Sequence, residues 1–198
     1  MEKMGEPAVK RDRTYTYGDY KNWPDDERWE LIDGTAWNMS PAPNRFHQGY
    51  LIGFIVQIGP YLEGHPCRMY AAPFDVLLPD RADQEEDEVV TVVQPDISVI
   101  CDPGKLTDKG CTGAPDWIIE ILSPYTSKKD MTVKFDLYRR HRVREYWIVD
   151  PGNRYVHVYI LDEDGRYPEE PEVYLKNAVV PCTVLEGLSI DLPRVFTE

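Results

Sequence analysis

The chain has 198 residues, which is the size of one domain. With 42% hydrophobic and 12% aromatic residues it can bury a core, so wholesale disorder is excluded. No stretch approaches the ~18 consecutive apolar residues of a membrane span, and the first ten residues lack the apolar centre of a signal peptide. The sequence therefore predicts a cytoplasmic protein with no membrane contact. Its formal charge of −13 argues against a protein that coats nucleic acid electrostatically.

The first elements are a tail and a short helix. We expect residues 1–13 to form a flexible tail and residues 14–198 to form a single domain. A helix is predicted over 17–23, because Thr16 can cap its first turn and Pro24 ends it.

A hairpin and a long helix follow. Segments 29–32 and 35–39 flank Asp33-Gly34, a dipeptide typical of a type I′ turn because glycine accepts a positive φ. Apolar residues then recur at helical spacing, which predicts a helix over about 44–62.

The middle of the chain reads as strands. We predict them near 67–70 and 74–78, and over 89–100 with an interruption at Pro95. The run over 117–122 is almost wholly apolar, which favours a strand buried on both faces.

A crossover unit is expected next. A predicted helix over about 128–141 leads to a strand at 145–150, and strand, helix, strand over this distance indicates a right-handed parallel connection. The remaining apolar segments are expected to form an antiparallel meander: 155–161, 172–175 and 179–184.

The net charge is unevenly distributed. Residues 128–144 contain seven basic and two acidic residues, so this segment is +5 and the rest of the chain −18. A basic helix on an acidic body is compatible with a local phosphate contact and equally with a solvated helix face.

The four cysteines are scattered, at positions 67, 101, 111 and 182, and none forms a C-x-x-C pair. Zinc and redox motifs need closer spacing, so we expect free thiols in a reducing compartment.

Glu120 is the strongest local anomaly. It lies inside the run Trp-Ile-Ile-Glu-Ile-Leu, where an unpaired buried carboxylate costs several kcal/mol unless a cation, a proton or a metal compensates it. Asp96, on the preceding strand, can lie beside it, and a bound Mg²⁺ or Mn²⁺ would relieve the repulsion between the two acids. The alternative is an exposed Glu120 and an Asp96 that caps a turn after Pro95.

Several segments resemble the Uma-type restriction endonuclease family, long described as a family of unknown function, within the PD-(D/E)XK restriction-endonuclease-like superfamily. Together they span about residues 14–192. The matching segments are Trp29–Gly34, Met39-Ser40-Pro41 with His47, Gln94–Val99, Ile118–Pro124 with Lys134 and Tyr138, and Glu145–Pro151.

The resemblance implies an α/β (α+β) fold with a restriction-endonuclease-like core, in which helices flank a mixed central sheet and further antiparallel strands are added. It also implies a metal-dependent DNA endonuclease that takes Mg²⁺ or Mn²⁺ on Asp96 and Glu120. Many such nucleases carry a lysine two residues after the second acid, where this chain has Leu122. The resembled family places the lysine on the following helix, where Lys134 matches and would stabilise the transition state.

Further residues have candidate roles, each with a plainer alternative. Glu30 matches the first family motif and is a candidate catalytic residue, although a glutamate beside a hairpin is often surface. His47 is a candidate for substrate binding, although a lone histidine is more often structural. Lys128 and Lys129 are candidate phosphate contacts or solvated cations.

The rival to a nuclease is a module that keeps the fold with weak or no turnover and binds nucleic acid or protein. The acidic net charge supports it, and hydrolysis of RNA or another phosphoester is a third possibility. If the chain cuts both DNA strands, two active sites are needed, and a homodimer is the commonest way to supply them.

Overall fold

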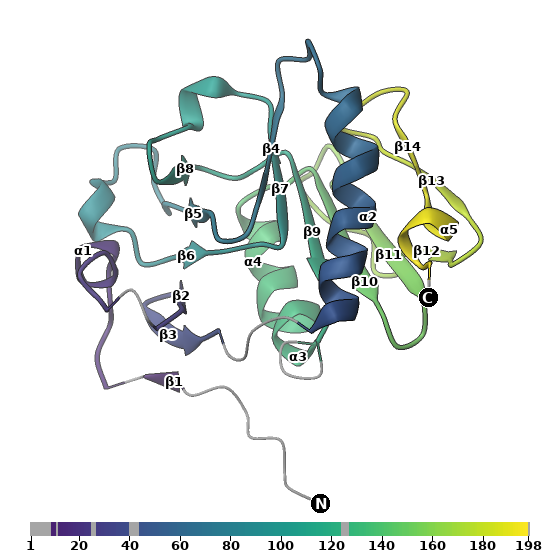
Figure 1. Cartoon of the computed structure of the whole chain (residues 1–198). Helices are drawn as coiled ribbons and strands as arrows, with labels where there is room; N and C mark the ends of the chain where they lie inside the picture. The colour runs from purple at the N-terminus through teal and green to yellow at the C-terminus, as the bar shows by residue number, and fades with distance from the viewer. Residues whose placement is uncertain (1–8, 11, 25–26, 40–43, 124–126, 198) are drawn as a thin grey trace, which may run out of the picture.

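The structure is a computed structural model that describes residues 9–10, 12–24, 27–39, 44–123 and 127–197, with the backbone alone for residues 9, 10 and 128. Its described part forms two six-stranded mixed sheets and a small antiparallel hairpin (Figure 1). The helical elements are α1 (Tyr17–Tyr20), α2 (Arg45–Tyr61), α3 (Ser127–Lys129), α4 (Phe135–Arg140) and α5 (Leu192–Val195), with a π-helical turn η3 (Asp130–Lys134) and 3₁₀ turns η1 (Glu86–Glu88) and η2 (Pro103–Lys105).

The strands divide between the two sheets as follows. The first sheet has the order β1 (Val9–Lys10), β3 (Thr35–Asn38), β2 (Trp29–Ile32), β6 (Val92–Val93), β5 (Asp75–Leu77) and β8 (Gly110–Thr112). The second has the order β12 (Glu172–Leu175), β11 (Tyr155–Ile160), β10 (Glu145–Asp150), β9 (Trp117–Ile121), β7 (Ile97–Ile100) and β4 (Arg68–Ala71). The hairpin pairs β13 (Val179–Pro181) with β14 (Ser189–Asp191).

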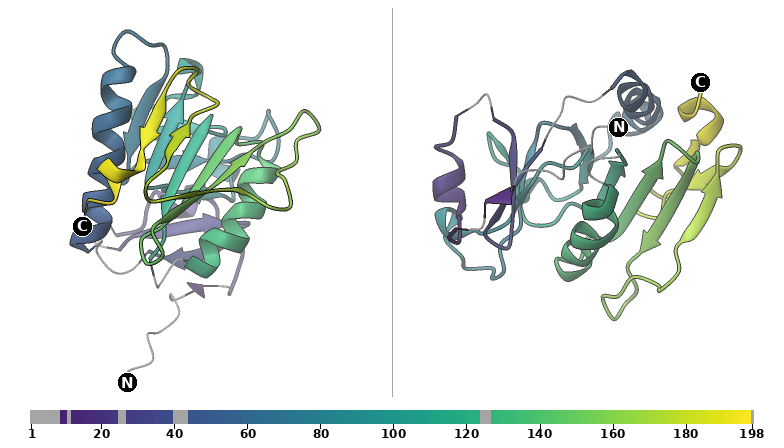
Figure 2. Two further views of the ribbon diagram at one scale, coloured as in Figure 1. Left: turned by 90° about the vertical axis from the view of Figure 1, so that its right-hand side faces the viewer. Right: turned by 90° about the horizontal axis from the view of Figure 1, so that it is seen from below.

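Helices cover both faces of the second sheet. Strand β9 alternates its side chains, as the period of two requires: Trp117 and Ile119 pack in the core that includes α2, and Ile118 packs in the core that includes α4. The strand is therefore buried on both faces, as its apolar run predicts. Figure 2 shows α2 and α4 on either side of this sheet.

Local sequence signals account for several elements. Thr16 and Asp19 form the capping box of α1. Asp33 and Gly34 have φ of 49° and 72°, which confirms the type I′ turn between β2 and β3. Strands β9 and β10 pair in parallel, so the predicted crossover between them is confirmed.

Two strand predictions need correction. Segment 89–100 is not one interrupted strand, because β6 pairs within the first sheet and β7 within the second. The chain passes from one sheet to the other at Pro95. Segment 179–184 does not continue the meander of β10, β11 and β12, because β13 pairs with β14 instead.

The N-terminal segment also departs from a wholly flexible tail. Within residues 1–13, Val9 and Lys10 form β1, which pairs with Trp37 and Ala36 of β3. No helix in the described residues combines the length and hydropathy that crossing a membrane requires.

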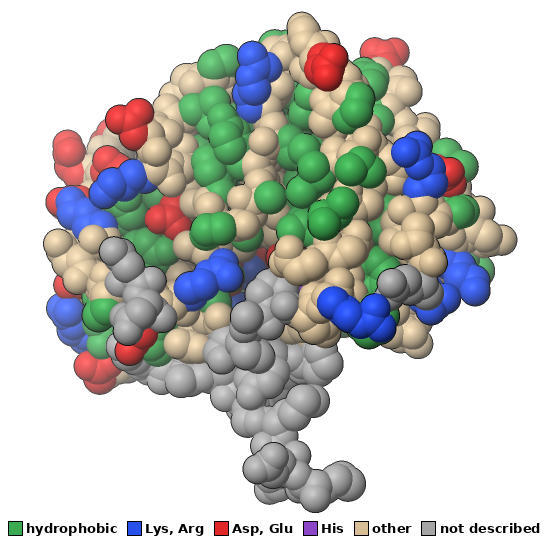
Figure 3. All heavy atoms as spheres, viewed as in Figure 1, with side chains coloured by type: hydrophobic (Ala, Val, Ile, Leu, Met, Phe, Trp, Pro, Cys, Tyr) green, Lys and Arg blue, Asp and Glu red, His purple; other side chains and the backbone are tan. Residues whose placement is uncertain are grey.

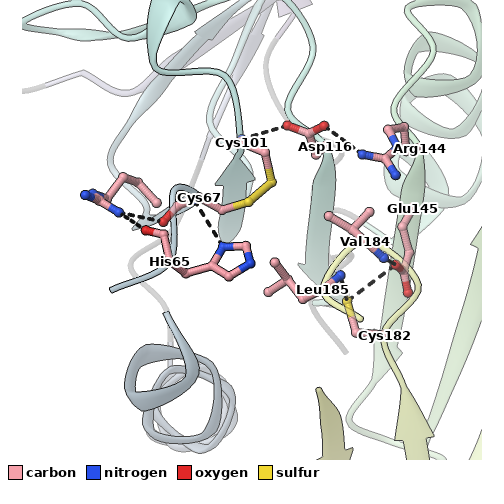
Figure 4. The surroundings of a disulfide bond; sticks show 10 residues. His65, Cys67, Cys101, Asp116, Arg144, Glu145, Cys182, Val184 and Leu185 are labelled. Atoms are coloured by element: carbon pink, nitrogen blue, oxygen red, sulfur yellow. Dashed lines mark hydrogen bonds and ion pairs between the residues drawn. A yellow bond between two sulfur atoms is a disulfide. The ribbon is translucent and has the colours of Figure 1, made fainter. Parts of the chain in front are cut away.

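The prediction of four free thiols is wrong for two of them. Cys67 and Cys101 form a disulfide, which joins the ends of the paired strands β4 and β7 (Figure 4). The backbone N–H of Cys101 also donates to Asp116, which is ion-paired with Arg144. Spacing along the chain did not indicate this pairing, because strand register brings the two cysteines together across 34 residues.

The outward face of α2 is apolar. Ile52 and Val56 are 55% and 50% exposed, and hydrophobic side chains gather over this helix in the space-filling view (Figure 3).

Candidate active site

A cavity of about 120 Å³ opens where the two sheets meet, beside the passage at Pro95. Strand β2, the end of β9, the first turn of α2 and the turn η3 all contribute to it. Its charged and imidazole side chains are Arg28, Glu30, His47, Asp96, Glu120, Lys129, Asp130 and Lys134. The candidate residues from five separate parts of the chain therefore line one cavity.

Asp96 is fixed by two donors. One carboxylate oxygen accepts the backbone N–H of Ile121 at 2.7 Å, and the same oxygen lies 3.2 Å from Nε2 of His47. Burial disfavours the charged imidazole, but the hydrogen bond and charge of Asp96 outweigh it and raise the pKa of His47. Among the described residues, Nδ1 of His47 has no hydrogen-bond partner. His47 thus orients the acid rather than packing as an isolated core histidine.

Glu120 is buried and paired, not exposed at an edge. Its Oε1 accepts from Nζ of Lys134 at 2.8 Å and from the hydroxyl of Tyr138 at 2.7 Å. Burial raises the pKa of Glu120 to about 8, with further increases from the carboxylates of Asp130, Asp96 and Glu30, while Lys134 opposes the shift. The compensating cation that the apolar strand demands is Lys134, and Lys134 alone does not offset the burial of Glu120 and the carboxylates around it.

Glu30 lies in this cavity and not at the surface. It is fully buried, ion-paired with Lys129 and, at 2.8 Å, with Lys134, and it accepts the backbone N–H of Gln94 at 2.9 Å. Burial favours the neutral acid, but the two lysines outweigh burial and lower the pKa of Glu30 to about 2. This carboxylate is therefore the anion that holds both lysines in the cavity.

The turn η3 explains how two lysines five positions apart reach one glutamate. In a regular α-helix, Lys129 and Lys134 would point about 140° apart. The π-helical hydrogen-bond pattern over Asp130–Lys134 adds residues to this turn and brings the two lysines onto a common face. A regular helix over 128–141 was predicted, and that prediction is wrong at this turn. Such turns are rare and occur often at functional sites.

The sequence missed two charged members of the cavity, Arg28 and Asp130, and assigned Lys129 a different role. Asp130 follows the first lysine, is 2% exposed and lies 3.6 Å from Nζ of Lys134. Lys129 is buried against Glu30 rather than free for a phosphate contact. Tyr138, named above only as part of a family segment, donates a hydrogen bond to Glu120. The available signal for Asp130 was the presence of an acidic residue within a basic segment. Its place in the cavity depends on the π turn.

Asp75, in the predicted strand 74–78, lies outside this cavity, where it accepts from the hydroxyl of Tyr20 and from the side chain of Gln94. The side chain of Lys128 lies outside the described residues, as do Ser40 and Pro41 of the second family motif.

The residues fit a hard divalent ion with two protein ligands. Within the described part of the chain, no three or more His, Cys, Asp or Glu side chains form a complete metal cluster. Mg²⁺, however, keeps several waters and is usually held by one or two carboxylates together with substrate phosphates. Asp96 and Glu120 supply two such carboxylates on one cavity.

Comparisons with known proteins agree with this fold. A solved structure described as a "putative nuclease belonging to DUF820", from Anabaena variabilis, superposes with a TM-score of 0.71 at 22% identity over 92% of this chain and 97% of that chain. This similarity confirms the predicted mixed α/β fold. No curated protein matches the chain.

A family model described as "Uma2: Putative restriction endonuclease" matches residues 17–193, which is most of the chain. The motifs that carried the resemblance lie within this range, and the cavity is built from them. The chain therefore belongs to the Uma2 family of restriction-endonuclease-like proteins.

Proposed function

We propose that the protein is a metal-dependent DNA endonuclease, with Asp96 and Glu120 as the ligands of Mg²⁺ or Mn²⁺ and Lys134 as the transition-state stabiliser. The observation that carries the proposal is the shared cavity, which both acids line together with a buried lysine that is ion-paired with Glu120. Four carboxylates line this cavity against two lysines and one arginine, and this excess of negative charge supports a cation-binding role.

A bound divalent ion would supply positive charge to a phosphate oxygen and lower the pKa of a water. The protein's own residues do the positioning. His47 and the Ile121 N–H hold Asp96, while Tyr138 and Lys134 hold Glu120. The Lys134 ammonium lies within hydrogen-bond distance of an acid that faces the cavity. It can therefore donate a hydrogen bond to a phosphate oxygen as negative charge develops on that oxygen.

Glu30 and Lys129 act indirectly, by positioning other residues. Glu30 binds both lysines, so it fixes where Lys134 points without needing to touch a phosphate. In this proposal Glu30, predicted as a catalytic residue, is a positioning residue. Lys129, predicted as a phosphate contact, is instead ion-paired with Glu30.

Nicking of supercoiled plasmid with Mg²⁺ or Mn²⁺ tests this proposal. We expect Asp96→Asn and Glu120→Gln to lower the rate at least about 100-fold, because each removes a ligand worth several kcal/mol of transition-state stabilisation. Asp164→Asn, at an exposed turn, is the matched control and should cut like wild type. Equal nicking by all four proteins, or nicking that persists in chelator, would refute the site.

The second candidate is an inactive module with the nuclease fold. The acidic net charge favours it, and so does the engagement of Lys134 by Glu30 and Glu120. Tight Mn²⁺ binding without cleavage of any DNA form would support this candidate instead.

The homodimer remains a proposal, and one edge of the second sheet suits it. Strand β12 is terminal in the sheet, and its Val173 and Leu175 are 54% and 61% exposed. An antiparallel pair of β12 strands centred on Tyr174 would place Val173 opposite Leu175 of the other copy, and Glu172 opposite Lys176. The strand is thus self-complementary in both hydrophobicity and charge.

The cytoplasmic location also remains a proposal. The Cys67–Cys101 disulfide is the observation that stands against a reducing compartment, because such bonds are rare in cytosolic proteins.

A further inference from the structure

A second, larger cavity lies between α1 and the start of β2. Its volume is about 470 Å³, within the roughly 300–1,000 Å³ of small-molecule sites. Four aromatic side chains line it: Tyr17, Tyr20, Trp23 and Trp29. Tyr17 and Trp29 are buried, whereas Tyr20 and Trp23 are half-buried and present ring surface to the cavity.

This aromatic cavity shares a wall with the cavity lined by Asp96 and Glu120, the catalytic cavity of the proposed function. Arg28 and Gln94 line both. The Gln94 side chain donates to the Tyr20 hydroxyl and to Asp75, and accepts from Arg28, while its backbone N–H donates to Glu30. One residue therefore ties the aromatic cavity to the anion that positions the lysines.

The charges on this wall differ from those of the whole chain. Three basic residues, Lys21, Arg28 and Lys109, line the aromatic cavity against two acidic ones, in a protein whose net charge is −13. The Nε atom of Arg28 is buried and has no acceptor among the described residues. Such a donor is costly unless an acceptor is supplied, and a phosphate or base oxygen from a ligand would supply it.

We propose that the aromatic cavity binds an unpaired nucleobase of the DNA strand whose phosphodiester lies in the catalytic cavity. Aromatic rings with neighbouring cations recognise the faces of unstacked bases, which a duplex keeps covered. Arg28, on the shared wall, contacts the phosphate between the two cavities. The proposal rests on the proposed function and narrows its substrate to DNA with an unpaired nucleotide.

Binding measured without catalysis tests this inference. Labelled oligodeoxythymidylate is titrated with protein in chelator and followed by fluorescence anisotropy, with a blunt duplex of equal length alongside. Wild type should bind the single strand more tightly than the duplex. Trp23→Ala should weaken single-strand binding about 5- to 150-fold, the loss expected for one stacked base.

Two further variants keep the test decisive. Tyr155→Ala removes a half-buried aromatic ring that lines neither cavity, and it should bind like wild type. Lys109→Glu, at an exposed position in the cavity wall, should weaken binding even if Trp23→Ala fails to fold.

Equal affinity for the duplex and the single strand would overturn the inference. Unchanged binding by both Lys109→Glu and a folded Trp23 variant, either Trp23→Ala or Trp23→Leu, would also overturn it. Because no cleavage is measured, failure here leaves the nuclease proposal standing. Conversely, if the protein binds single strands through Trp23 but cuts no DNA, only the nuclease proposal is refuted.

Discussion

Glu120 and Glu30 are buried in the same cavity, yet their neighbours shift their pKa values in opposite directions. Burial and nearby acids favour a neutral Glu120, whereas two lysines favour an ionised Glu30. Substitution of each by glutamine should therefore change stability with opposite sign, although both variants remove a charge at the same depth.

Glu120→Gln should stabilise the metal-free protein at high pH. Because the folded pKa of about 8 lies above the ordinary 4.5, the contribution of this acid is fully present below pH 4.5 and is lost as the pH rises through 8. In chelator, the free energy of unfolding of wild type should fall across this window by on the order of a few kcal/mol relative to the variant. Urea denaturation at pH 5 and pH 9 measures it. Glu63→Gln, in the exposed turn after α2, is the control and should follow wild type.

Glu30→Gln should destabilise the protein near neutral pH by about 3–5 kcal/mol, because two buried lysines lose their common partner. The folded pKa of Glu30 is depressed, so its contribution is present above pH 4.5 and lost as the pH falls toward 2. Thermal unfolding from pH 7 down to pH 3 should therefore show wild type converging on the variant. A variant as stable as wild type at pH 7 would contradict the paired lysines.

The extra residue in the π-helical turn η3 can be tested by deletion. Deletion of Met131, which is 44% exposed, should restore a regular helix in which Lys129 and Lys134 are four positions apart, about 40° around the axis. Since Leu137 and Tyr138 anchor α4 in the core, both lysines should still face Glu30. We expect the deletion variant to keep its helical circular dichroism and its nicking activity, as Met131→Ala should. A folded deletion variant that no longer nicks DNA would contradict this account of the turn.

Elements fixed by local chemistry could be predicted from the sequence, and those fixed by tertiary contacts could not. Asp33-Gly34 determines its turn through backbone preference, and the apolar run of β9 determines its burial. The π turn has no comparable signal, because it brings Lys129 to Glu30, which lies 99 residues earlier in the chain. The same holds for the Cys67–Cys101 bond, which follows from strand register.

The candidate site could be predicted in part for a related reason. Asp96 and Glu120 were identified because a carboxylate beside or within an apolar strand needs a partner. The burial of Lys129 and Asp130 follows from the twist of one helical turn, and the aromatic cavity follows from packing between α1 and β2. Neither leaves a periodic pattern in the chain.

The whole molecule is predicted to be a dimer joined through β12. Leu175→Lys should dissociate it, because the new charge would lie opposite Val173 of the other copy. Light scattering after size exclusion should give twice the chain mass for wild type and one chain mass for the variant. Val56→Lys, at an apolar position on α2 that is 50% exposed, is the control and should remain dimeric. A wild-type monomer at micromolar concentration would contradict this interface.

Anomalous diffraction from crystals grown with Mn²⁺ tests the metal site most directly. The account predicts a single strong peak in the catalytic cavity, coordinated by carboxylate oxygens of both Asp96 and Glu120, with Lys134 adjacent. A peak bound elsewhere, or saturating Mn²⁺ that leaves Glu120 paired with Lys134 and no ion on Asp96, would contradict it.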